Sequence, residues 1–143
     1  MAGSAVFEAQ RDYGLRIPKA VRNYSMKKQS DYAELLSNFR AAAVDYGEAL
    51  EIGDHKSANK AARLGSKLKN EIVARGDKPV KILVTLLDDG DPWVRYATAA
   101  STLDIEPERA YRVLTELQAL PEAIGAAAFT VIRMWETGAM PAK

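Results

Sequence analysis

The sequence predicts an all-α protein built from antiparallel helical hairpins. Residues that favour helix, chiefly Ala, Leu, Glu, Lys and Arg, dominate most of the 143-residue chain. Apolar residues recur at the i, i+3, i+4 and i+7 spacing of amphipathic helices, and turn signals separate these segments. The run "VKILVTLL" at 80–87 has the composition of a strand. Pro79 before it and the "DDGDP" turn after it favour two turns of helix instead.

Composition and charge restrict the classes of function. The chain has no cysteine and one histidine, His55, which excludes disulfides and thiolate sites and disfavours a His-based metal site. A net charge of +1 gives no strong global attraction to nucleic acid or to an anionic membrane. We find no apolar run of about 18 residues and no secretory signal pattern. We therefore expect a soluble, cytoplasmic protein with no membrane partner.

The first half of the chain predicts an arm followed by a hairpin. We expect residues 1–29 to form an N-terminal arm or short helix, and residues 30–143 to form a single helical domain. Within it, residues 30–76 carry two amphipathic patterns joined by a tight turn at Gly53. The stripe of the first is Tyr32, Leu35, Leu36, Phe39, Ala43, Tyr46 and Leu50, and that of the second is Ala58, Ala61, Gly65, Leu68 and Ile72. Two such helices are expected to pack antiparallel.

Shorter helices are predicted in residues 77–143. We expect them at 78–88, 91–103, 107–119 and 121–137, and the short connections favour consecutive helices packing side by side. A blurred repeat relates the first two to the last two at a shift of 29 or 30 residues. At these shifts Leu83, Val84 and Leu87 coincide with Val113, Leu114 and Leu117, and Pro92, Ala97, Ala100 and Leu103 with Pro121, Ala126, Phe129 and Ile132. The sequence therefore predicts two short helix pairs.

The stretch "DDGDPWVRYATAASTL" at 88–103 predicts a capped turn that leads into a packing helix. Asp91 is suited to accept hydrogen bonds from the first backbone N–H groups, and Pro92 is suited to the first helical position. A stripe of smaller residues, Val94, Ala97 and Ser101, is expected to let a neighbouring helix approach closely. Arg95 is placed to reach a carboxylate of the preceding turn.

This stretch resembles the helix–turn–helix of a HEAT-like repeat, whose recognisable core is Asp-x-x-Pro-x-Val-Arg-x-x-Ala. The matching residues are Asp89, Pro92, Val94, Arg95 and, at the alanine position, Thr98 between Ala97 and Ala99. The whole chain is also similar to small bacterial proteins with a HEAT-like C-terminal half. The resemblance implies helical hairpins stacked as a short α-solenoid, or α-α superhelix. The second unit departs from the motif because no Val-Arg follows Pro121, which is typical of a terminal repeat.

The leading functional hypothesis is a non-enzymatic protein–protein interaction module. Stacked helix pairs offer an extended surface for another protein, and the resemblance implies an immunity, antitoxin-like or adaptor role. The candidate partner-binding residues are Trp93, Arg95 and Tyr96. Trp93 is equally compatible with a core position, whereas for Arg95 a structural role in the turn is favoured over contact with a partner. Trp135 is expected in the core.

The alternative hypothesis is a nucleic-acid-binding HEAT-like protein. Lys56, Lys60, Arg63 and Lys67 form a basic stripe at helical spacing. Residues 56–81 contain eight basic residues and two acids, a net charge of +6, whereas residues 31–55 carry a net charge of −5. The favoured explanation of the stripe is a solvated helix face balanced by the acidic helix before it.

An enzyme, or a non-catalytic or cryptic enzyme subunit, is the third hypothesis. The carboxylates Asp88, Asp89, Asp91, Asp104, Glu106 and Glu108 flank two turns, where helix capping and the helix dipole account for most of them. No nucleophile motif or metal-spaced set occurs. We therefore expect no enzyme activity, no catalytic or metal-binding residues and no cofactor. The sequence names neither the partner nor the oligomeric state.

Overall fold

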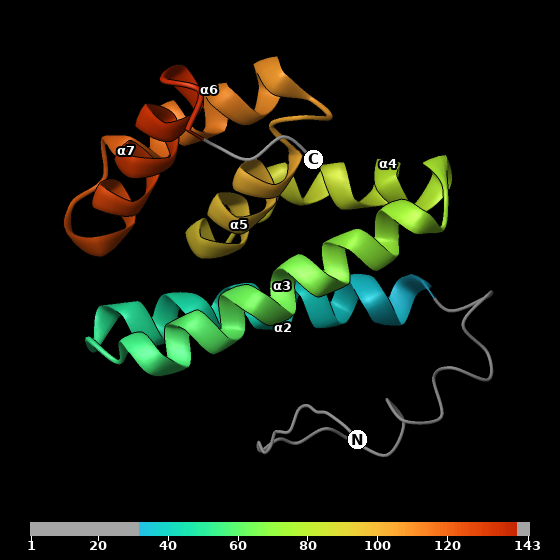
Figure 1. Cartoon of the computed structure of the whole chain (residues 1–143), viewed down its shortest axis with the longest axis horizontal. Helices are drawn as coiled ribbons and strands as arrows, with labels where there is room; N and C mark the ends of the chain where they lie inside the picture. Colours follow the sequence, from blue (N-terminus) through green and yellow to red (C-terminus); the bar gives the residue numbers. More distant parts are fainter. Residues whose placement is uncertain (1–31, 140–143) are drawn as a thin grey trace. The chain divides into compact units, whose positions relative to one another are not determined.

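The computed structural model describes residues 32–139. The predicted arm at 1–29 lies outside the described residues. All described residues from Ala33 onward belong to one compact unit. They form six α-helices and one 3-10 helix, shown in Figure 1: α2 (Tyr32–Glu51), α3 (His55–Ala74), α4 (Asp77–Thr85), η3 (Leu86–Asp88), α5 (Pro92–Thr102), α6 (Pro107–Gln118) and α7 (Glu122–Glu136).

The all-α fold class is confirmed for the described residues, and the strand-like run 80–87 is helical. Consecutive helices pack as hairpins, namely α2 with α3, α5 with α6, and α6 with α7. The predicted pairing of α4 with α5 is a minor contact by comparison, because η3 lies between them and packs on α5 itself. The structure thus shows helical hairpins, and it does not show a regular solenoid.

Two glycines end helices where the sequence places them. Gly53 has φ +78° and closes the turn between α2 and α3, and Gly76 has φ +107° between α3 and α4. L-residues with a Cβ rarely adopt these angles, which is why glycine stands there. Asp54 then caps α3, because its side chain accepts a hydrogen bond of 3.1 Å from the Ser57 backbone N–H.

The repeat is blurred by a difference in capping. Pro92 is the first residue of α5, preceded by the capping side chain of Asp91. Pro121 is itself the N-cap of α7 and provides no side-chain cap. Glu122 takes a positive φ of 69° after it, and a Cβ on Gly125 would lie 2.0 Å from the Leu120 carbonyl oxygen. The connection between α6 and α7 is therefore tighter than its counterpart before α5.

The core joins α5, α6 and α7 to α4 and η3. Its most deeply buried members come from each of these helices, including Leu83, Leu87, Ala99, Leu114 and Ala128. Two threonines of α5, Thr98 and Thr102, are fully buried as well. Each hydroxyl donates to the carbonyl four residues earlier, so neither buried oxygen lacks a partner.

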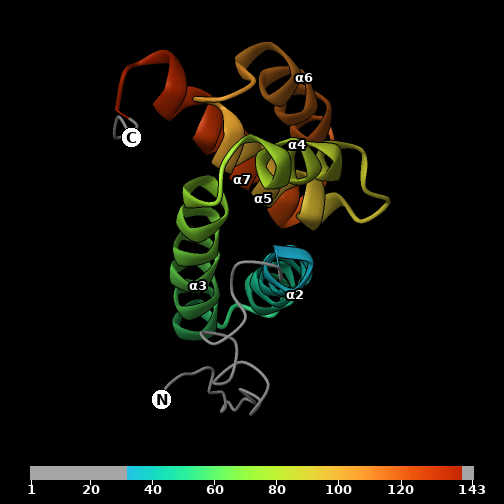
Figure 2. The same ribbon diagram turned by 90° about the vertical axis from the view of Figure 1, so that its right-hand side faces the viewer.

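Trp93 connects α2 to this core. Its indole lies against the backbone of Gly47, where a Cβ would come within 2.2 Å of the ring. Its Nε1–H donates a 2.8 Å hydrogen bond to Glu51 Oε2 near the end of α2. Figure 2 looks along α2 and shows it beneath α5, with α3 rising beside it. The absence of a side chain at Gly47 therefore sets how closely α2 and α5 approach.

Among residues 32–139, no helix is both long enough and apolar enough to cross a membrane.

We predict that Gly47→Ala destabilises the protein by about 2 kcal/mol, because the added methyl overlaps the Trp93 ring. Gly65→Ala in α3 is the matched control, since a Cβ there meets nothing within 4 Å. It should stabilise the protein by about 0.5–1 kcal/mol through helix propensity. Urea unfolding of both variants measures the two changes, and equal effects of the same sign would refute this account of Gly47.

Candidate binding surface between α2, α3 and α5

A network of charged groups fixes the turn before α5. The Arg40 guanidinium on α2 donates from Nε and Nη2 to the two carboxylate oxygens of Asp89, each at 2.9 Å. Asp89 Oδ1 also accepts from the Asp91 backbone N–H, and Asp91 in turn accepts from the N–H groups of Trp93 and Val94. The predicted N-cap role of Asp91 is confirmed. These contacts connect α2 to the start of α5.

Arg95 has a structural contact in this turn. Its Nη1 donates to the Asp89 backbone carbonyl at 2.7 Å, and its side chain is partly buried. The sequence predicts a carboxylate partner in the preceding turn. In the structure Arg95 contacts Asp89, one of the expected residues, but at its backbone carbonyl. Both carboxylate oxygens of Asp89 accept hydrogen bonds from Arg40 instead. A partner-binding role for Arg95 stays a prediction.

Trp93 and Tyr96 form an aromatic cluster with Tyr46 of α2. The Tyr46 and Tyr96 rings are stacked at 5.9 Å, and Trp93 meets both edge-on at 5.8 and 5.5 Å. Only 6% of Trp93 is exposed, so this residue belongs to the core, which was one of the two positions compatible with the sequence. Burial raises the pKa of the Tyr96 hydroxyl, and the neighbouring Tyr46 raises it further. Of these residues, Tyr46 and Tyr96 also reach the pocket described next.

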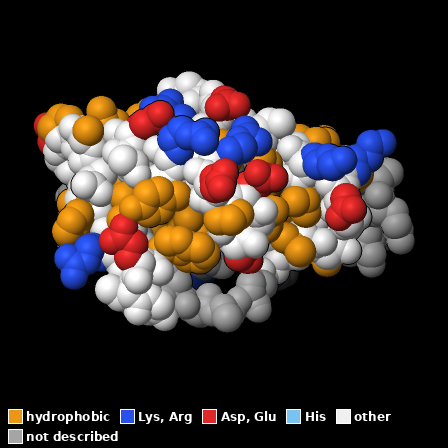
Figure 3. All heavy atoms as spheres, turned by 90° about the horizontal axis from the view of Figure 1, so that it is seen from above, with side chains coloured by type: hydrophobic (Ala, Val, Ile, Leu, Met, Phe, Trp, Pro, Cys, Tyr) orange, Lys and Arg blue, Asp and Glu red, His pale blue; other side chains and the backbone are white. Residues whose placement is uncertain are grey.

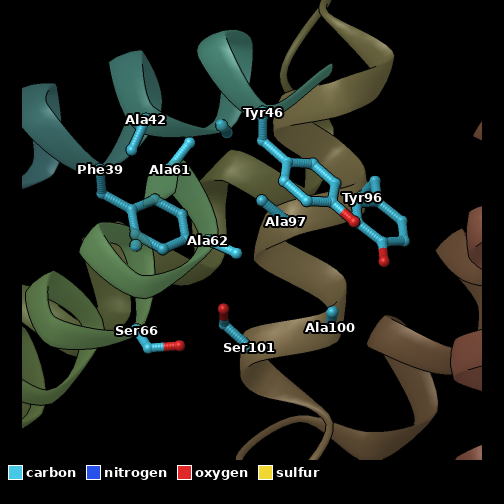
Figure 4. A pocket seen from close by; sticks show the side chains of 12 residues that line it. Phe39, Ala42, Tyr46, Ala61, Ala62, Ser66, Tyr96, Ala97, Ala100 and Ser101 are labelled. Atoms are coloured by element: carbon cyan, nitrogen blue, oxygen red, sulfur yellow. The ribbon is translucent and has the colours of Figure 1, made fainter. Parts of the chain in front are cut away.

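A pocket of about 170 Å³ lies between α3 and α5, and residues of α2 close it on a third side (Figure 4). Its floor comes from α2, with Phe39, Ala42, Ala43 and Tyr46. One wall is α3, with Ala61, Ala62, Gly65 and Ser66, and the other is α5, with Tyr96, Ala97, Ala100 and Ser101. Ser66 and Ser101 carry hydroxyl groups on opposite walls. The two walls carry mostly small apolar side chains, and the serine hydroxyls are the polar groups near the edge of the pocket.

The pocket interrupts two stripes that the sequence predicts to be packed. On α3, Ala58, Leu68 and Ile72 are buried, but Ala61 and Gly65 between them line the pocket. On α5, Val94 is buried, whereas Ala97 and Ser101 on the same predicted stripe face the opening. The helix expected to approach these small residues is therefore not one of the described helices.

The predicted basic stripe lies on the exposed surface of α3. Lys56, Lys60, Arg63 and Lys67 are all exposed. Lys69 is different, because it is largely buried and forms a 3.5 Å ion pair with Asp104 beyond the end of α5. This ion pair connects the two walls of the pocket near one end.

Apolar side chains are also exposed on α7. Phe129 is 46% exposed, with the Arg133 guanidinium 5.8 Å from its ring centre, and Trp135 is 37% exposed. The predicted core position of Trp135 is wrong, because it lies near the C-terminal end of α7. Phe129 and Trp135 are six residues apart and so point in different directions from the helix. Figure 3 shows hydrophobic side chains on this side of the molecule interspersed with charged ones.

The acidic side chains near the turns take part in structural contacts within residues 32–139. Within 32–139, no group of three or more His, Cys, Asp or Glu side chains is placed to hold a metal ion. The carboxylates that flank the turns have structural contacts instead, such as the 3.7 Å ion pair of Asp88 with Arg109. The Tyr111 hydroxyl donates to Glu136, which raises the tyrosine pKa. Neither arrangement is placed at the pocket.

Sequence reasoning identified the small residues but not the pocket that they line. Helical spacing indicated that Gly65 and Ala97 lie on packing faces, yet it could not show that the two faces oppose each other across a gap. Ser66 carried no signal in the sequence, and Ser101 was placed on a packing stripe and not at the edge of a pocket. The one usable signal was Gly65, because a glycine in the interior of a predicted helix lowers helix stability and usually has a packing or functional reason.

No protein-family model, no curated protein and no solved structure matches this chain. The likeness of residues 88–103 to a HEAT-like repeat therefore rests on the motif itself. What the structure supports is a small all-helical protein, with six helices in residues 32–139.

Acid should remove the contribution of the Arg40–Asp89 pair to stability. The hydrogen bonds from Arg40 hold the pKa of Asp89 below its ordinary value, and the Asp89 side chain is only 13% exposed. A lowered folded-state pKa gives stability that is present above the unfolded value of about 3.9 and is lost as the pH falls through the folded value. Wild type should therefore exceed Arg40→Gln in unfolding free energy at pH 7, and this difference should shrink below about pH 4. Urea unfolding at several pH values measures it, and a difference that stays constant down to pH 2 would contradict the assignment.

Proposed function

We propose that this protein is a non-enzymatic protein-interaction module that binds its partner at the pocket between α3 and α5. The observation that carries the proposal is the pair of small-residue faces left without a packing helix. Buried apolar pockets with a few polar groups at the edge are the usual form of binding sites. A partner that covers Ala61, Gly65, Ala97 and Ser101 would complete the packing that the sequence pattern anticipates.

The pocket has the size that an anchoring side chain needs. Its volume of about 170 Å³ is comparable to an apolar cavity of about 150 Å³, which accepts a benzene-sized group. Interfaces commonly take most of their affinity from a few large side chains seated in such pockets. Because the Lys69–Asp104 ion pair and the Tyr46–Tyr96 stack hold the lining elements together, little rearrangement is needed on binding.

We further propose that the helical hairpins form a short HEAT-like α-solenoid of bacterial type. It is supported by the match at Asp89, Pro92, Val94 and Arg95 and by the capping of α5. Under this proposal the protein is an adaptor or an immunity-type protein of the cytoplasm, and its partner is another protein.

A second function, nucleic-acid binding, is favoured by one observation, the exposed basic stripe on α3. A stripe of this kind follows a phosphate backbone through charge alone, so its affinity falls steeply with salt. The stripe faces away from the buried side of α3, and no pocket or aromatic surface accompanies it among the described residues. We therefore give the protein-binding function priority.

Closing the pocket should abolish partner binding. The chain contains no cysteine, so Ser66→Cys/Ser101→Cys can be bridged across the pocket with a flexible bismaleimide. The immobilised protein should retain a discrete set of proteins from a lysate of its source, and the bridged form should retain at least tenfold less of them. The same variant left unbridged and the wild type exposed to the reagent are the controls. Equal retention by the bridged form would exclude the pocket as the binding site.

Nucleic-acid binding should be weak and salt-sensitive. We expect a 20-base-pair duplex to bind with a Kd above about 10 μM at 150 mM salt, which is the range of nonspecific contacts. Fluorescence anisotropy at 50 and 150 mM salt gives the affinity and its salt dependence. Submicromolar binding at 150 mM salt that is lost in Lys56→Glu/Arg63→Glu/Lys67→Glu, with the helical circular dichroism unchanged, would favour the nucleic-acid function instead.

A further inference from the structure

We propose that two copies of this protein associate through α7, whose exposed face pairs antiparallel with the same face of the second copy. This face, the α7 stripe, consists of Glu122, Ala126, Phe129 and Arg133. Helix α7 supplies no residue of the pocket between α3 and α5, so the inference is independent of the proposed function. The exposure, the spacing and the charges of the stripe each point to a second copy of this chain.

The α7 stripe lies on the side of α7 that no described helix covers. Helix α7 packs on α6 and α5 (Figure 1), and its residues in the core are Ile124, Ala128, Val131 and Ile132. All four residues of the stripe are exposed. Phe129 is 46% exposed, although phenylalanine is among the residues most often buried. A single copy therefore leaves this aromatic ring in contact with solvent.

The spacing of the α7 stripe is that of a contact between two helices. Its members stand at i, i+4, i+7 and i+11, the alternation of four and three residues that keeps one seam of a helix facing a partner helix. At about 100° per residue they lie within about 60° of one another around α7. Two of them are seen to share a face, because the Arg133 guanidinium lies 5.8 Å from the centre of the Phe129 ring.

The stripe is complementary to itself when the second copy runs in the opposite direction. An antiparallel pair that places Ala126 opposite Phe129 also places Glu122 opposite Arg133, because both pairs are centred between residues 127 and 128. A two-fold axis at this point produces each contact twice. The small Ala126 leaves room for the phenyl ring, and a carboxylate meets a guanidinium at either end. Size and charge therefore match in one and the same register.

The two charged ends of the stripe select the antiparallel orientation. Glu122 and Arg133 are separated by about 16 Å along the helix axis, so they cannot pair within one copy. Neither forms an ion pair with another residue of 32–139. A parallel pair would place each of the two residues opposite its own counterpart and bring like charges together. The antiparallel pair gives all four charges a partner of opposite sign.

Sedimentation equilibrium of the full chain tests for this dimer. We expect a weak monomer–dimer equilibrium with a Kd on the order of 10–100 μM, because one helix pair buries less surface than a standard interface. Phe129→Ala should raise the Kd at least tenfold. Met134→Ala is the matched control, since Met134 is 36% exposed but lies about 140° around α7 from Phe129. A wild-type chain that is monomeric tenfold above this concentration range would overturn the proposal, and so would a dimer that Phe129→Ala weakens no more than Met134→Ala does.

Exchange of the two charges tests the antiparallel register. Glu122→Arg and Arg133→Glu should each weaken self-association at least tenfold, because each variant places like charges opposite each other. An equimolar mixture of the two variants should associate as wild type does, because each then meets opposite charges in the other. The double variant Glu122→Arg/Arg133→Glu should also dimerise as wild type does. Circular dichroism checks that each variant is folded, and folded single variants that fail to associate in the mixture would overturn the antiparallel pairing.

Discussion

The close contact between Trp93 and Gly47 determines how the two halves of the described fold meet. The indole fills the space that a side chain at position 47 would occupy, and its Nε1–H is bound by Glu51 of the same helix. The Arg40–Asp89 pair makes a second connection between α2 and the start of α5. Because α2 supplies the floor of the pocket and α5 supplies one wall, this contact also sets the position of the candidate binding surface.

The pocket exists because α3 packs against its neighbours near its two ends but not at its centre. Ala58 at one end and Leu68 and Ile72 at the other are buried, and the residues between them are small. Larger side chains at Ala61 or Gly65 would have filled the gap from within. The gap is therefore kept open by small side chains, and it leaves apolar atoms at the surface of the described structure.

Much of the fold could be predicted because its signals are local. Amphipathic spacing and the turns at Gly53 and Gly76 located the hairpin, and the capping chemistry of Asp91 located the start of α5. The pairing of helices was harder, since the sequence indicated a pair of α4 with α5 while the structure packs α5 with α6. The site was not predictable, because it depends on a gap between faces about 35 residues apart in sequence. The core position predicted for Trp135 was wrong, because helical periodicity does not show whether the last turn of a helix packs against a neighbouring helix.

The contacts between α2 and α5 also bear on the order in which the protein folds. Trp93–Glu51 and Arg40–Asp89 join residues separated by 42 and 49 positions, whereas the α5–α6 and α6–α7 hairpins close over short turns. Long loops lose more entropy on closure than short turns, so contacts between distant residues form later on average. We therefore expect the C-terminal hairpins to form first and to present the Trp93 ring as the template on which α2 docks. The candidate binding surface would then be the last part of the described structure to be completed.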